Sequence, residues 1–391
     1  MEHDSPISRR KFLRQAGIAA SAGLAASTPL LFSANRAFGG VPQINFAYIL
    51  SDHHAPLMLL AGEWERFRES CGTYIKPVRS RTLYDMHVNG ARVARIKLIP
   101  TKKGPDVQKL VANGDVDAGI SGTQAILLSV DRGAGVKLIS PLQKAGNVFV
   151  VQKDLPVQGF HDFLNLVRDT KQGMKVGMPG PHCVATIIFR SALDRAGVTY
   201  TESSADSGAD VQLINMKGHS NLTTALSNGM AEAVIGAQPY PAIAVERGEG
   251  RMAANLQDLP ATVDWRGHAC CSLEATTEFL QREPDLARSL MEMMVRAARS
   301  TAERPDLAAK ACSGWLGDSL AVEKRAMPTL AYGTEPTQGW RQSVRSFIQS
   351  MREMGMFKGT LSEDAGGDPE SRVYDFTLVN DVREQLELTS A

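Results

Sequence analysis

The sequence has no excess of charge of either sign, and this balance argues against a nucleic-acid-binding protein. Lys and Arg number 43 and Asp and Glu number 42, so the composition predicts no basic surface for phosphates. The 34 glycines and 19 prolines among 391 residues are too few for a collagen-like or disordered chain. This length accommodates two or three compact lobes, each with a core of its own.

The short motifs of the common enzyme classes are also missing. The chain contains no GxSxG elbow, no GxxxxGK[ST] phosphate loop, no dinucleotide fingerprint and no signature of paired catalytic carboxylates. It contains no HExxH, no CxxC and no zinc-ribbon spacing. These absences favour a binding protein over an enzyme.

The N-terminal segment has the composition of an export signal. Arg9 and Arg10 precede Lys-Phe-Leu and an uncharged run, Ala16–Leu31, that is too short and too weakly apolar to span a bilayer. The pattern resembles a twin-arginine signal peptide, although an N-terminal amphipathic helix is an alternative. Small residues near Gly39 suit a signal peptidase, so we predict a leader over 1–39 and a soluble protein in a bacterial periplasm.

The chain after this leader contains an internal repeat. A shift of 115 positions aligns residues 96–139 with 211–254 without a gap, and 11 of the 44 pairs are identical. Chance would give roughly two or three identities at average composition. The period is too long for a solenoid, so the repeat predicts two related α/β units in two lobes.

Both units follow the same order of strand, helix, Asn-Gly, strand and second helix. The Asn-Gly pairs suit the ends of helices over 106–112 and 221–227. Alternating strands and helices predict an α/β fold in which each lobe is a mostly parallel sheet flanked by helices. Ligands of such sheets bind beyond the carboxyl ends of the strands. The expected contacts in the two units are Ser121, Gly122, Thr123, Gln238 and Tyr240, although Ser121 and Thr123 would also suit helix caps.

Two further loops follow predicted strands. Strand 44–50 ends in a polar loop, and the glycine- and proline-rich segment 175–183 leads into a helix over 184–196, an arrangement that suits a polar ligand at a helix N-terminus. A simple connection between strand and helix is the alternative for the second loop. The expected ligand contacts in these two loops are Asp52, His53, His54, Pro181, His182 and Cys183.

Two segments, 147–152 and 268–272, are predicted to be strands that cross between the lobes, and His268 joins the expected contacts. The second lobe would then comprise residues 148–268. Residues 40–147 would form the first part of lobe one, and 269–391 would return to it with amphipathic helices over 285–301, 307–314 and 340–354 and a closing helix over 380–388.

The five cysteines leave several possibilities open. They are Cys71, Cys183, Cys270, Cys271 and Cys312. Buried structural thiols are the commonest outcome, a disulfide is a second, and a copper or zinc site that unites His268, Cys270 or Cys271 with His182 and Cys183 is a third. Because adjacent residues of a strand face opposite sides, at most one of Cys270 and Cys271 is expected to face such a site. We therefore predict no cofactor and no metal.

Several segments together resemble the periplasmic solute-binding proteins of ABC importers. They are residues 52–57, 110–123, 175–181, 225–235 and 238–240, and they are most similar to the branch that binds nitrate, bicarbonate, taurine and alkanesulfonates, with its relatives for thiamine pyrimidine precursors. The resemblance implies a two-lobed type II fold with two hinge strands. It also implies a monomer that closes on a small polar or anionic ligand and delivers it to an inner-membrane ABC permease with its ATPase.

The chain departs from that branch in two respects. It shows no clear set of cationic side chains at the strand ends to hold a sulfonate or nitrate, and it lacks the cysteine-rich run of the pyrimidine-precursor proteins. Two other functions remain open on the same fold. One is an enzyme of cofactor biosynthesis that uses Asp52, His53, His54 and Cys183 as a nucleophile–base set, and the other is a periplasmic ligand sensor.

Overall fold

The structure is a computed structural model that describes residues 40–170, 173–203, 208–362 and 368–388. The predicted leader lies outside these residues. From Gln43 onward the chain forms one compact unit. Among the described residues, no helix has the length and apolar character needed to cross a membrane.

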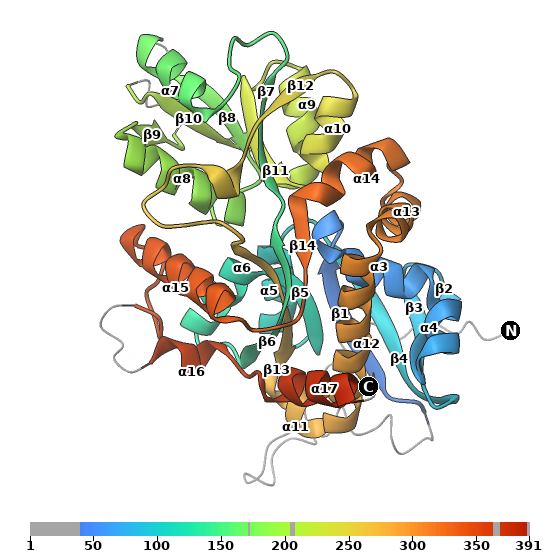
Figure 1. The fold of residues 1–391 in the computed structure, drawn as a ribbon. Coiled ribbons are helices and arrows are strands. Elements are labelled where there is room, and N and C mark those ends of the chain that lie inside the picture. The colour runs from blue at the N-terminus through green and yellow to red at the C-terminus, as the bar shows by residue number, and fades with distance from the viewer. Residues whose placement is uncertain (1–39, 171–172, 204–207, 363–367, 389–391) are drawn as a thin grey trace, which may run out of the picture. The chain divides into compact units, whose positions relative to one another are not determined.

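The first sheet has eight strands in the order β14-β6-β13-β5-β1-β4-β3-β2 (Figure 1). We call this sheet and the helices packed on it the first lobe. Its central strands β5, β1 and β4 are parallel, and its outer strands pair antiparallel. The strands are β1 (Gln43–Ile49), β2 (Thr73–Arg79), β3 (Leu83–Val88), β4 (Ala91–Thr101), β5 (Ala118–Gly122), β6 (Val136–Ala145), β13 (Ala269–Thr276) and β14 (Leu330–Tyr332).

The second sheet has six strands in the order β12-β7-β11-β8-β10-β9, and with its helices it forms the second lobe. Its strands β11, β8, β10 and β9 are parallel, whereas β7 and β12 pair antiparallel. They are β7 (Asn147–Gln152), β8 (Met174–Met178), β9 (Tyr200–Thr201), β10 (Val211–Asn215), β11 (Ala233–Ala237) and β12 (Gly250–Asn255). The order β6-β13-β5-β1-β4 in the first lobe thus has a counterpart, β12-β7-β11-β8-β10, in the second.

Helices cover both sheets (Figure 1). In the first lobe, the apolar helix α3 lies against α12 and α13, whereas in the second lobe Phe149 of β7 contacts Phe163 of α7 and Phe189 of α8. The helices before the return to the first sheet are η1 (Asp52–His54), α3 (Ala55–Gly62), α4 (Trp64–Ser70), α5 (Gly104–Ala112), α6 (Thr123–Asp131), α7 (Phe160–Asp169), α8 (Val184–Ala196), η2 (His219–Asn221), α9 (Leu222–Ser227), α10 (Tyr240–Glu246) and η3 (Leu256–Asp258). Those after it are α11 (Thr277–Arg282), α12 (Pro284–Glu303), α13 (Pro305–Leu316), α14 (Leu320–Ala326), η4 (Met327–Thr329), α15 (Gln338–Glu353), α16 (Pro369–Val373) and α17 (Thr377–Leu388).

The internal repeat is present in the backbone as well as in the sequence. Gly114 and Gly229, which lie 115 positions apart, end α5 and α9 with φ of 73° and 66°. Their N–H groups donate to Val111 and Leu226, which are again 115 positions apart. Only the glycine of each Asn-Gly pair takes the left-handed conformation, because glycine has no Cβ to clash with the backbone there.

Carboxylates at equivalent positions of the two repeat units also accept equivalent backbone hydrogen bonds. Asp117 accepts a hydrogen bond from the N–H of Asn45 at 2.8 Å, and Glu232 accepts one from the N–H of Lys175 at 2.7 Å. In each case the carboxylate stands just before a central strand and contacts the parallel strand beside it. The two lobes therefore share this detail of strand pairing as well as their strand order.

Most predicted elements exist, and three differences matter. The expected helix over 57–69 is two helices, α3 and α4. The hairpin strands β2 and β3 were not predicted, although Asn89-Gly90 is a strong sequence signal for the turn between β3 and β4; these residues have φ of 49° and 82°. Strand β6 and helix α7 were also missed.

The chain passes between the sheets at two places. The first is Ala145-Gly146, where both residues have positive φ, directly before β7. The second is Gly267-His268, directly before β13. The N–H of Ala145 donates to the carbonyl of His268 at 3.0 Å, so the two crossings are hydrogen-bonded to each other.

Candidate functional site

A small cavity of about 40 Å³ lies where the two lobes meet. The first lobe contributes residues from the end of β1, from η1 and from β13, and the second contributes residues from β7, η2, β11 and the start of α8. The lining residues are Ile49, Ser51, His53, His54, Gly104, Gly122, Gln124, Asn147, Cys183, Val184, His219, Ala237, Cys270 and Cys271. Four of the residues expected from the sequence are among them, namely His53, His54, Gly122 and Cys183.

His53 is held in a single orientation by the first crossing. Its Nε2 lies 3.0 Å from the carbonyl oxygen of Gly146, and a carbonyl can only accept, so Nε2 carries the proton. In the neutral imidazole the lone pair is then on Nδ1. Nδ1 lies 3.2 Å from Sγ of Cys270 and 3.7 Å from Sγ of Cys271.

Both cysteines face His53, and the expectation that at most one would do so is wrong. The reason is an irregularity in β13. Opposite β6, Ala269 pairs with Lys144 and Cys271 pairs with Gln143, so Cys270 is an extra residue. Such a bulge breaks the alternation of side chains along a strand, and it brings both sulfurs to one side.

The thiols do not form disulfides. All five cysteines lie in the described part of the chain, and each is a free thiol. Burial by itself would raise the pKa of Cys270, but its side-chain hydrogen bonds, foremost that with Cys271, lower that pKa well below its usual range. The pKa of Cys271 is raised by its hydrogen bond with Cys270 and by burial.

A second layer of polar groups supports the cysteines. Asn147 Nδ2 lies 3.2 Å from Sγ of Cys270 and 3.0 Å from Nε2 of His268. His268 in turn places Nδ1 at 3.1 Å from the carbonyl oxygen of Trp265. His268 was expected to contact the ligand, and the structure instead places it behind Asn147.

His54 presents a free donor to the cavity. Its Nδ1 accepts a hydrogen bond from the N–H of Ile49 at 3.0 Å, so Nε2 carries the proton. That Nε2 is buried and has no hydrogen-bond partner among the described residues. Burial and the neighbouring His53 lower the pKa of His54 to about 3, so its ring is neutral.

The cavity also contains residues that sequence reasoning missed. His219 follows β10, and its Nδ1 accepts a hydrogen bond from the N–H of Ala237 at 3.2 Å. Burial and His53 lower the pKa of His219 to about 4. Gln124 Nε2 donates to the carbonyl of His182 at 3.1 Å, from one lobe to the other. His219 could have been identified from its place after a predicted strand.

Other predicted residues make contacts inside the protein. Ser121 Oγ accepts a hydrogen bond from Gln108 at 3.0 Å, and the Thr123 hydroxyl lies 2.8 Å from that of Ser272. Gln238 accepts from the N–H of Ala242 through Oε1 at 3.1 Å. Pro181 is half-buried next to the exposed His182, whose side chain borders a separate cavity of about 380 Å³ along α5 and α6.

Asp52 is directed away from the cavity towards the C-terminal helices. Carboxylate oxygens of Asp52 and Glu323 and Sγ of Cys312 all lie within 4.8 Å of one another, and the three residues are buried. Burial and the charge of Glu323 raise the pKa of Asp52, and burial raises the pKa of Glu323 to about 7. The Glu323 carboxyl group is therefore at least partly protonated near neutral pH.

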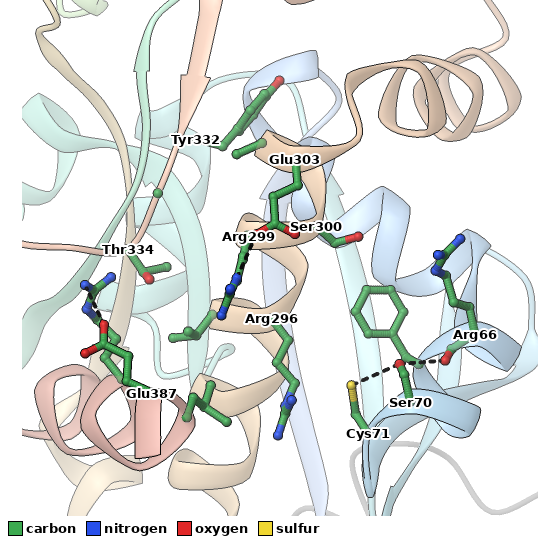
Figure 2. A pocket seen from close by; sticks show the side chains of 16 residues that line it. Arg66, Ser70, Cys71, Arg296, Arg299, Ser300, Glu303, Tyr332, Thr334 and Glu387 are labelled. Carbon is green, nitrogen blue, oxygen red and sulfur yellow. Dashed lines mark hydrogen bonds and ion pairs between the residues drawn. The ribbon is translucent and has the colours of Figure 1, made fainter. Parts of the chain in front are cut away.

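A larger cavity of about 630 Å³ lies on the first lobe between α4, α12 and α17 (Figure 2). Its charged side chains are largely paired: Arg299 contacts Glu303 at 2.8 Å and Arg383 contacts Glu387 at 3.7 Å. Ser70 donates to the carbonyl of Arg66 at 2.8 Å. All of its lining residues belong to the first lobe, so a molecule bound there would not bridge the lobes.

Comparison with known families identifies the chain at this point. The family model described as NMT1-like matches residues 39–315. The chain belongs to the NMT1-like family. The match covers every strand of both sheets except β14 and all the lining residues of the cavity described above, and it agrees with the resemblance inferred from the sequence.

Similar solved structures show the fold of this family member. They include the periplasmic nitrate-binding protein NrtA from Synechocystis PCC 6803, with 14% identity, 89% of this chain and 90% of that chain covered, and a TM-score of 0.68. The ligand-binding component of an ABC-type import system from Staphylococcus aureus has 14% identity, 87% and 99% coverage and a TM-score of 0.67. The alkanesulfonate-binding protein SsuA from Xanthomonas axonopodis has 14% identity, 88% and 98% coverage and a TM-score of 0.59. The two-lobed periplasmic-binding-protein fold expected from the sequence is thereby confirmed.

A curated relative of the NMT1-like chain aligns with a smaller part of its sequence. The uncharacterized protein MJ1180 from Methanocaldococcus jannaschii is 27% identical over 103 residues, which are 26% of this chain and 71% of that protein.

Proposed function

We propose that the protein is an exported, non-enzymatic solute-binding component of an importer. It captures a small solute between its lobes and delivers it to an ABC-type permease with its ATPase. The observation that carries this proposal is the cavity at the junction, because its lining comes from both lobes. A ligand that contacts both lobes stabilises the closed form over the open one, whereas a ligand on one lobe alone does not.

Direct contacts between the lobes fit a closed state. Ser51 Oγ donates to the carbonyl of Gln238 at 2.6 Å, and Tyr240 Oη donates to the carbonyl of Leu50 at 3.0 Å. Arg325 of α14 pairs with Glu246 of α10 at 3.1 Å. These contacts join the end of β1 and the C-terminal helices to the second lobe, and hinge opening would break them together with the bond from Gln124 to His182.

The two crossings supply the proposed hinge. Rotation about Ala145-Gly146 and Gly267-His268 would move the second lobe as one body against the first. Hinge closure of two lobes around a ligand is a common mode of motion in proteins of this architecture. The twin-arginine-type leader over 1–39 would direct the protein to the periplasm, where we propose that it acts as a monomer.

The ligand differs in kind from what the names of the similar structures suggest. NrtA and SsuA are named for nitrate and alkanesulfonate, yet no Lys or Arg is among the lining residues of this cavity. Anions could be held here only by neutral donors such as His54 Nε2–H and backbone N–H groups. The cavity is also small, so a compact solute fits it best.

The test combines identification of a bound solute with a measurement of closure. Native mass spectrometry of the protein purified from periplasm, before and after denaturation, should reveal a small species that is lost on unfolding. Small-angle scattering with that species added back should show a smaller radius of gyration. Chemical conversion of the species would instead support an enzyme, and binding without compaction would contradict the importer role.

A further inference from the structure

We propose that His53, Cys270 and Cys271 bind a single soft metal ion, copper(I) or zinc(II), in the cavity between the lobes. The inference rests on the proposed function, because it names the class of solute that the cavity takes. The ligand atoms would be Nδ1 of the histidine and the two sulfurs.

The distances between these atoms suit one shared ion. The three atoms lie within 4.8 Å of one another, and Nδ1 lies 3.2 Å and 3.7 Å from the two sulfurs. In a tetrahedral zinc site with bonds of about 2.3 Å to sulfur and about 2.0 Å to nitrogen, the N···S separation is about 3.5 Å. The observed separations lie on either side of this value, so an ion requires only small shifts.

The histidine is oriented as metal-binding histidines are. Such residues almost always donate their second ring N–H to a carbonyl or carboxylate, which fixes the tautomer and directs the lone pair at the metal. His53 does this with the carbonyl of Gly146 at 3.0 Å. The lone pair of Nδ1 therefore points towards the two sulfurs before any ion arrives.

The surroundings favour a soft ion over a hard one. No Asp, Glu, Lys or Arg is among the lining residues, and thiolates select copper(I) and zinc over magnesium or calcium. Asn147 donates to Cys270 at 3.2 Å, which stabilises a thiolate there. The cavity volume of about 40 Å³ suits two or three water-sized groups.

Copper(I) and zinc(II) would differ in whether they need a ligand from the second lobe. Copper(I) is satisfied by three ligands, whereas zinc(II) in proteins is almost always four-coordinate. Cys183 lines the same cavity from the second lobe, and it is the best candidate for a fourth ligand. His219 is less suited, because its Nδ1 already accepts from Ala237 at 3.2 Å. Zinc bound in this way would connect the lobes covalently.

The experiment titrates the fully reduced, metal-free protein with each ion in competition with a chromophoric chelator. We expect one ion per chain and, for copper(I), a thiolate-to-copper charge-transfer absorption. Cys270→Ser and Cys271→Ser should each weaken binding at least 100-fold, and Cys71→Ser, a half-buried thiol on another part of the first lobe, should leave it unchanged. Cys183→Ser should weaken zinc binding and spare copper(I).

Three results would overturn the proposal. One is loss of both ions to a micromolar chelator. Another is equal binding by wild type and the Cys270→Ser and Cys271→Ser variants, and the third is binding of more than one ion per chain with no dependence on the two cysteines. Circular dichroism of each variant shows whether a loss reflects unfolding, and the double variant Cys270→Ser/Cys271→Ser with an unchanged melting temperature keeps the test decisive.

Scattering separates this inference from the proposed function. If the metals do not bind but another solute compacts the protein, the metal site is wrong and the importer component stands. If a metal binds to His53 and the two cysteines without compaction, the site is correct and the importer role is contradicted.

Discussion

Asp117 and Glu232 make the same contact in two different sheets. Each carboxylate accepts a hydrogen bond from the backbone N–H of the neighbouring parallel strand, at Asn45 and Lys175. The two residues lie 115 positions apart, the period of the repeat in the sequence. Because the contact recurs in both copies of the repeat, we infer that the carboxylate helps to align the strand that follows it with the neighbouring parallel strand.

Loss of either carboxylate should therefore destabilise its own lobe. We expect Asp117→Ala to lower the free energy of unfolding by about 2 kcal/mol and Glu232→Ala by about 1 kcal/mol, since each loses a charge-assisted hydrogen bond. The first loses more because Asp117 also pairs with Arg282 at 3.0 Å. Urea denaturation measures both values, and the exposed neighbour Asp115, as Asp115→Ala, should change stability by less than about 0.5 kcal/mol. Losses no larger than that of Asp115→Ala would contradict a structural role.

Tyr240→Phe should shift the protein towards its open form. The variant removes the hydrogen bond to the carbonyl of Leu50 at 3.0 Å, and a single neutral hydrogen bond contributes about 1 kcal/mol. We expect a roughly five-fold change in the ratio of open to closed protein, measured by distances between spin labels on the two lobes. Tyr200→Phe is the matched control, because Tyr200 bonds within the second lobe to Asp194; an equal shift in both variants would rule out this role for Tyr240.

Glu274→Gln should flatten the dependence of stability on pH. Burial raises the pKa of Glu274 to about 7, although Gln108 and Ser121 act in the opposite direction. The native state then holds a proton that the unfolded state releases above its pKa of about 4.3. This contribution is complete below pH 4 and is lost as the pH rises to about 7.

The wild type should thus lose on the order of 3 kcal/mol through this group between pH 4 and pH 7.5, and the variant should not. Free energies of unfolding at several pH values give the difference directly. Glu278→Gln, an exposed carboxylate on α11 (Thr277–Arg282), serves as the control and should follow the wild type. A parallel curve for Glu274→Gln would mean that this carboxyl group does not hold the proton.

Gly146→Ala should damage the first crossing. Gly146 has a φ of 74°, and a Cβ there would lie 2.4 Å from Leu330 Cδ2 and 2.8 Å from His53 Nε2. We expect a loss of about 2–3 kcal/mol from backbone conformation and overpacking together. Gly333→Ala, where an added Cβ meets no atom within 4 Å, should be close to neutral in thermal denaturation. A melting temperature for Gly146→Ala equal to that of wild type would contradict this reading of the crossing.

The features that could be predicted from the sequence are those determined by neighbouring residues in the chain. Left-handed glycines after helices recur at a fixed period, and this made the repeat visible. Strand β7 and helix α8 were predicted with the bounds that they have, since a buried apolar run and a loop rich in glycine and proline define them. The same reasoning placed His53, His54, Gly122 and Cys183 at strand ends.

The features that were missed depend on long-range pairing. Thr123 contacts Ser272 because β13 returns beside β5, and no local pattern encodes that return. Strand β3, which lies between β4 and β2, alternates half-buried and buried residues over Leu83–Met86, but its polar composition hid this period. Asp52 faces Glu323, which is 271 positions later in the chain, so only the folded structure brings the two together.

The bulge at Cys270 separates the chemistry of the cleft from the architecture of the sheet. Pairing of β13 with β5 continues in register from Cys271 to Ala275, whereas the pairing of β13 with β6 shifts at Cys270 and at two later points. The irregularity is thus confined to one side of β13. Two thiols are set beside His53 while the central pairing of the sheet stays regular.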